Sequence, residues 1–76
     1  MTNSTAKKVA QVGQIVQNRY SQAIAKVIAI ETRDNYVAYF VRRLGGECQQ
    51  WGSAITSEVS ASTEKFYARH GDFTGN

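Results

Sequence analysis

The sequence predicts a mainly β domain, a small curled barrel of about five short strands followed by a short C-terminal helix. Residues 23–30 and 36–43 are rich in β-branched and aromatic side chains, which suit a pleated strand. Turn signals follow both runs, Asp34-Asn35 after the first and Gly45-Gly46 after the second. Hydrophobic residues make up 42% of the 76 residues, enough for one compact core.

The N-terminal stretch over residues 9–30 admits two interpretations. Apolar side chains recur every three or four residues, the period of an amphipathic helix, at Val9, Val12, Val16, Tyr20, Ala23, Val27 and Ile30. One long helix would make the chain a small helical protein, such as a bacterial or phage regulator. Gly13 interrupts this pattern, however, and β-branched residues dominate the second half of the stretch. We therefore favour two strands, over residues 14–19 and 23–31.

The later elements are a strand pair and a helix. A third strand is expected over residues 36–43, and a short partner strand over residues 49–52. We expect residues 56–59 to form a single helical turn that closes one mouth of the barrel. Residues 60–70 have modest helix character, and Gly71 is expected to end that helix in the left-handed cap conformation.

These elements divide the chain into three regions. We expect a flexible N-terminal arm over residues 1–11, a barrel over residues 12–60, and a short helix with a frayed tail over residues 61–76.

Composition argues against several classes of protein. No run approaches the roughly 20 apolar residues of a membrane span, and no signal-peptide core is present, so we expect neither membrane insertion nor secretion. The lone Cys48 and the lone His70 supply neither a four-ligand zinc site nor a supported nucleophile. We therefore expect no metal, no cofactor and no enzyme activity. The net charge of +3 is compatible with an anionic partner.

Two strand motifs and a tryptophan occur in a fixed order along residues 12–59. Ala25-Lys26-Val27-Ile28 comes first, then Tyr39-Phe40-Val41-Arg42-Arg43, then Trp51 after a glycine-bearing loop. This order resembles the chromo-barrel, or Tudor-knot, domain, in which an Ala-Lys-Val-Ile strand precedes Tyr-Phe-Val-His-Tyr.

The resemblance implies an SH3-like barrel and a chromatin function. Such domains lie near the N-terminus of MYST-type histone acetyltransferases and of related chromatin subunits. The expected role is a non-catalytic module that docks an acetyltransferase-type protein on nucleic acid or on a histone tail. The expected partners include subunits of an acetyltransferase complex, the expected location is the nucleus, and the isolated domain is expected to be monomeric.

Family members that read methyl-lysine use an aromatic cage, because ring faces attract a quaternary ammonium. The resemblance places Arg43 where the family has one cage tyrosine, and Gly46 or Glu47 where it has a loop tryptophan. The rings left as a residual cage are Tyr20, Tyr39 and Trp51. A cation would be repelled by Arg43, so we expect methyl-lysine binding to be weakened or lost.

Basic side chains take the place of the missing rings. Charge combined with exposed aromatic rings is the chemistry of nucleic-acid binding, so RNA or DNA becomes an expected ligand. The predicted binding surface consists of Lys26, Arg33, Tyr36, Arg42 and Arg43. In the alternative interpretation the arginines are ordinary strand residues over a core that includes Tyr39 and Trp51. The chain would then be a protein-interaction domain without affinity for nucleic acid or methyl-lysine, and an exposed apolar patch would favour that reading.

Overall fold

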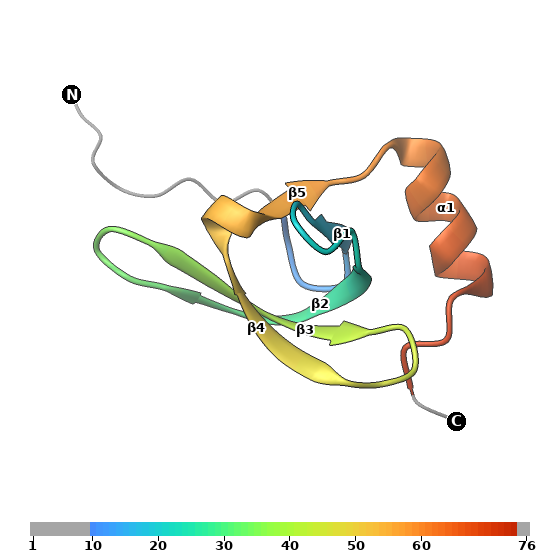
Figure 1. Ribbon diagram of the computed structural model, residues 1–76, viewed down its shortest axis with the longest axis horizontal. Helices are drawn as coiled ribbons and strands as arrows, with labels where there is room; N and C mark the ends of the chain where they lie inside the picture. Colours follow the sequence, from blue (N-terminus) through green and yellow to red (C-terminus); the bar gives the residue numbers. More distant parts are fainter. Residues whose placement is uncertain (1–9, 75–76) are drawn as a thin grey trace.

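The computed structural model describes residues 10–74, which form five strands, one 3-10 turn and one α-helix (Figure 1). In chain order these are β1 (Ile15–Asn18), β2 (Ile24–Thr32), β3 (Val37–Arg43), β4 (Cys48–Gly52), η1 (Ser53–Ile55), β5 (Thr56–Glu58) and α1 (Ala61–His70). The prediction of a mainly β domain with a short C-terminal helix is confirmed. The described part of residues 9–30 forms two strands, so the single-helix interpretation is wrong. The expected arm over residues 1–11 falls mostly outside the described residues.

The five strands form one antiparallel sheet in the order β4-β3-β2-β1-β5. The edge strands β4 and β5 are consecutive in the chain and are joined only by η1, which has three residues. In a flat sheet, four strand spacings would put these edges about 19 Å apart. Three residues of 3-10 turn rise only about 6 Å, so the sheet has to curl until its edges approach. Because no ladder joins β4 to β5 among the described residues, the curled sheet remains open.

The connection at η1 is held by two hydrogen bonds. The hydroxyl of the fully buried Thr56 donates to the Gly52 carbonyl (2.8 Å), and the Arg19 amide donates to the Ile55 carbonyl (2.8 Å). The expectation of a helical turn over residues 56–59 is wrong. The turn comes three residues earlier, and the backbone from Thr56 onward is extended because it pairs with β1.

One face of the sheet lines the core. Along β3, Val37, Tyr39 and Val41 share this face and are fully buried, and Ala38 on the opposite face is buried as well. Tyr39 lies directly opposite Trp51 on β4, and Val41 lies opposite Val27 on β2, so the central strand packs against both neighbours. The buried cluster consists of Ala10, Val16, Ala25, Val27, Val37, Tyr39, Val41 and Trp51.

Helix α1 lies beside the sheet, and its closest strand is β1 (Figure 1). Ser60 caps the helix, since its hydroxyl accepts a hydrogen bond from the Thr63 amide (3.2 Å). Glu64 links the helix to the sheet, because its Oε2 accepts from the Ile15 amide (3.5 Å). Acidic Glu64 in the first turn and basic residues in the last turn both suit the helix dipole.

The residues after α1 pack back onto the sheet instead of fraying at once. Phe73 is only 6% exposed, and the Gly45 amide donates to the Asp72 carbonyl (2.8 Å). Gly71 ends the helix as expected, but its φ of −77° is not left-handed, so the predicted cap conformation is wrong. Glycine is needed there for space, because a Cβ would lie 2.6 Å from the Tyr67 carbonyl oxygen and 2.7 Å from the Phe73 ring.

Replacing Gly71 by alanine is expected to lower the free energy of unfolding by about 1–3 kcal/mol, because the added methyl clashes with the Tyr67 carbonyl oxygen and with the Phe73 ring. Gly52→Ala is the matched control, since Gly52 has a φ of −74° and a Cβ there meets no atom within 4 Å. We expect Gly52→Ala to leave stability unchanged or slightly raised. Urea unfolding of both variants measures the difference. Equal stabilities would contradict the docking of Phe73.

Candidate functional site

The five residues of the predicted binding surface lie in three separate places. Lys26 and Arg42 are directly opposite each other on β2 and β3. Arg33 and Tyr36 meet at the tip of the β2–β3 hairpin, where the Arg33 amide donates to the Tyr36 carbonyl (2.9 Å). Arg43 follows Arg42 along β3, so its side chain points to the opposite face of the sheet. Of the four cations, the structure therefore brings only Lys26 and Arg42 together on one face.

Arg33 and Arg43 are neutralised by nearby carboxylates. Arg33 Nε donates to Glu31 Oε2 (2.8 Å), and Arg43 Nη1 lies 3.2 Å from Glu47 Oε1. The hydrogen bond to Glu31 and the negative charge of Glu31 raise the pKa of Arg33 above its ordinary value, so the guanidinium stays charged and paired. With Asp34 also at the hairpin tip, this end of the sheet does not attract anions.

The Lys26–Arg42 pair has no such compensation. Side chains directly opposite on antiparallel strands have Cβ atoms about 5 Å apart, and like charges at that position are destabilising. Neither cation forms an ion pair with any of the described carboxylates. Arg42 Nε is also buried and finds no hydrogen-bond acceptor within residues 10–74. The repulsion between the two cations thus lowers the stability of the fold, and an anion bound between them would relieve it.

One aromatic ring accompanies the Lys26–Arg42 pair. Lys26 Nζ lies 5.5 Å from the centroid of the Phe73 ring, a cation–π distance. This contact orders the long lysine side chain beside Arg42 without removing its charge. Phe73 is a site neighbour that the sequence analysis missed, because its role depends on the tail folding back across the sheet.

The three rings expected as a residual aromatic cage do not share a surface. Tyr39 is fully buried and Trp51 is 3% exposed, both within the core cluster. The Trp51 indole N–H donates to Gln49 Oε1 (2.9 Å). Tyr20, by contrast, is 79% exposed and lies in the turn between β1 and β2. The cage prediction is therefore corrected, since Tyr39 and Trp51 are core residues with no ring face open to an ammonium group.

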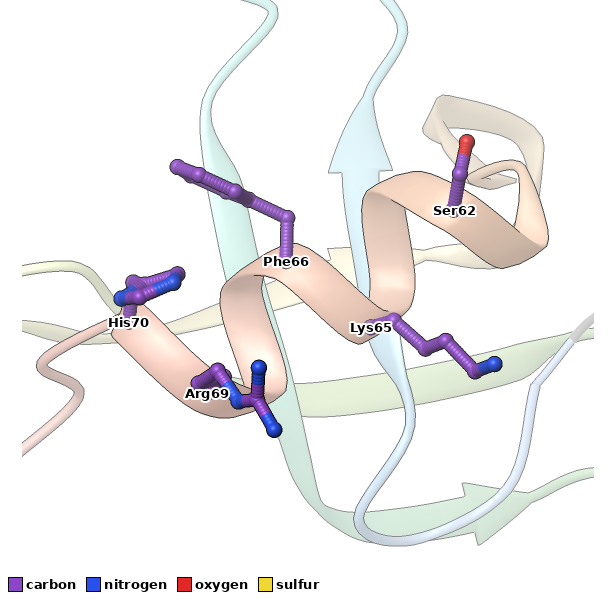
Figure 2. A pocket seen from close by; sticks show the side chains of 5 residues that line it. All are labelled: Ser62, Lys65, Phe66, Arg69 and His70. Carbon is purple, nitrogen blue, oxygen red and sulfur yellow. The ribbon is translucent and has the colours of Figure 1, made fainter.

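A second aromatic and basic surface lies on α1. Five side chains from this one helix border a hollow of ≈ 510 Å³ (Figure 2), and we call them the helix face: Ser62, Lys65, Phe66, Arg69 and His70. Sequence reasoning missed these residues as binding candidates. The sequence did contain a signal for this surface, because the five residues recur at spacings of three and four and so fall on one side of a helix.

Residues 10–74 contain no group of three or more His, Cys, Asp and Glu side chains placed to hold a metal ion. Within the same residues, no helix has the length and apolar character needed to cross a membrane. Cys48 is exposed on β4, whereas His70 lies at the end of α1 against Phe66.

No family model matches the chain, and no curated protein or solved structure is significantly similar to it.

Replacing Arg42 by methionine is expected to raise the free energy of unfolding by about 1 kcal/mol, because it removes the buried unpaired donor and the repulsion from Lys26. Arg33→Met is the control, and we expect no gain there because Arg33 already has Glu31 as a partner. Urea unfolding monitored by Trp51 fluorescence compares the two. A less stable Arg42→Met variant would show that the Lys26–Arg42 pair is not strained.

Proposed function

We propose that this chain is a non-catalytic binding domain that holds nucleic acid through its phosphate backbone at the Lys26–Arg42 pair. The observation that supports this proposal is the juxtaposition of two cations on one sheet face with no carboxylate partner among residues 10–74. Arginine offers a planar set of donors to phosphate oxygens and lysine offers a compact charge. A phosphate bound between them would offset their mutual repulsion.

The chromatin setting enters the proposal from the resemblance of residues 25–43 to chromo-barrel strands. In that setting the domain would dock a histone-acetyltransferase-type protein on nucleic acid in the nucleus, and catalysis would belong to another domain or subunit. Nucleic acid is preferred to a histone tail as the ligand, because histone tails are themselves basic and Lys26 and Arg42 would repel them. The burial of Tyr39 and Trp51 also argues against methyl-lysine binding.

A protein-interaction domain without nucleic-acid affinity is the alternative function. Such a domain is expected to expose a contiguous apolar patch on its surface. The exposed large apolar side chains come instead from separate turns and elements, at Val12, Tyr20, Ile28, Tyr36, Leu44 and Phe66. Single exposed apolar residues are normal on a protein surface, so these favour protein docking less than the Lys26–Arg42 pair favours an anion.

The proposal predicts a specific change in salt dependence. Binding of a short RNA or DNA strand should weaken linearly as the logarithm of salt concentration rises, because each neutralised phosphate releases counterions. The double variant Lys26→Gln/Arg42→Gln removes two phosphate contacts, so the slope should fall by about 2. Fluorescence anisotropy at several salt concentrations measures this slope.

Arg33→Gln is the matched control for this experiment, since Arg33 is neutralised by Glu31 and lies at the far hairpin tip. We expect its slope to equal that of the unmodified protein. Amide shifts of labelled protein should cluster at Lys26, Arg42 and Phe73 on titration. An unchanged slope in the double variant, or shifts confined to the hairpin tip, would refute the proposal.

A further inference from the structure

Phe66 is exposed on the side of α1 that does not pack on the sheet. Thr63, Glu64 and Tyr67 are the partly buried residues of the same helix, and Glu64 contacts β1. Phe66 falls on a different side and is 55% exposed. Packing of the helix therefore leaves this ring available to a ligand.

The Phe66 ring is ordered by two neighbouring rings. His70 lies 4.9 Å away at a tilt of 48°, and Tyr67 lies 5.1 Å away with its ring nearly perpendicular. Both separations are within the range of favourable aromatic contacts. A ring already held in one orientation loses less side-chain entropy when a ligand binds, so Phe66 is prepared for a flat partner.

Two cations flank this ring on the helix face. Lys65 and Arg69 are four residues apart, and like charges at that spacing weaken a helix. Neither forms an ion pair with a described carboxylate. Figure 2 shows them projecting from one edge of the helix face, with the Phe66 and His70 rings at the other edge. Ring stacking and charge are thus available side by side.

The helix face is close to the Lys26–Arg42 pair. Phe73 is three positions after His70 in the sequence, so their Cα atoms are at most about 11 Å apart. The Phe73 ring in turn lies 5.5 Å from Lys26 Nζ. A strand of a few nucleotides is therefore long enough to contact both surfaces at once.

We infer that the helix face binds single-stranded nucleic acid, with a base stacked on Phe66 and the backbone held by Lys65 and Arg69. This inference rests on the proposed function and extends it, because it predicts a preference for single-stranded over double-stranded nucleic acid. A base in a duplex is stacked on both sides by its neighbours, whereas an unpaired base has a free ring face. The hollow is lined by one helix alone, which suits a flat base better than an apolar side chain that needs opposing walls.

The test compares a thymidine strand of about ten nucleotides with the same strand lacking its bases, at one salt concentration, by fluorescence anisotropy. The unmodified protein should bind the thymidine strand about tenfold more tightly, because stacking requires the base. Phe66→Leu keeps an apolar side chain but removes the ring. It should weaken binding of the thymidine strand about tenfold and leave binding of the abasic strand unchanged.

Tyr20→Leu is the control, a still more exposed ring in the turn between β1 and β2, and it should leave both affinities unchanged. Circular dichroism checks that Phe66→Leu retains α1. If Phe66→Leu weakens both strands equally or neither strand, the inference fails while the proposed function stands. Absence of binding to either strand would overturn the proposed function itself. A glutamate-rich peptide could also bind more tightly than the thymidine strand and lose affinity in Phe66→Leu. That result would overturn the inference in favour of a protein partner.

Discussion

The fold depends on the short connection between its two edge strands. Because η1 offers only three residues between β4 and β5, the five-stranded sheet cannot lie flat, and its curl creates the enclosed side that holds Tyr39 and Trp51. Thr56 is buried where this connection meets the sheet, and its hydroxyl bond to the Gly52 carbonyl satisfies a polar group that would otherwise be costly there. The curl also fixes which side chains are left outside.

Outside the core, several side chains are arranged in ways that lower the stability of the fold. Lys26 and Arg42 repel each other across adjacent strands, and Arg42 Nε is buried without an acceptor among the described residues. On α1, Lys65 and Arg69 are like charges four residues apart. Proteins tend to break such local rules at functional sites. An anionic ligand would relieve both pairs of like charges, which have no ion-pair partner among residues 10–74.

The strands were predictable because their signals are local. The β-branched run over residues 36–43 matches β3 within one residue, and the alternative interpretation of the sequence placed Tyr39 in the core, where it lies. The neutralisation of Arg33 by Glu31, two residues away, was also visible in principle. What sequence reasoning missed depends on distant partners. Extended backbone from Thr56 requires pairing with β1, and burial of Phe73 requires the tail to return to the sheet.

The pairing of β5 with β1 has a consequence for how the molecule opens. Gln17 and Ser57 meet across 40 residues of sequence, whereas β1 to β4 pair with chain neighbours. Contacts of long sequence separation carry the larger loop-closure entropy, and a three-residue edge strand contributes few hydrogen bonds in return. Local opening would therefore release β5 first while the four-stranded meander stayed folded. Helix α1 and the tail would remain attached, because Glu64 binds β1 and Phe73 packs beside Lys26 on β2.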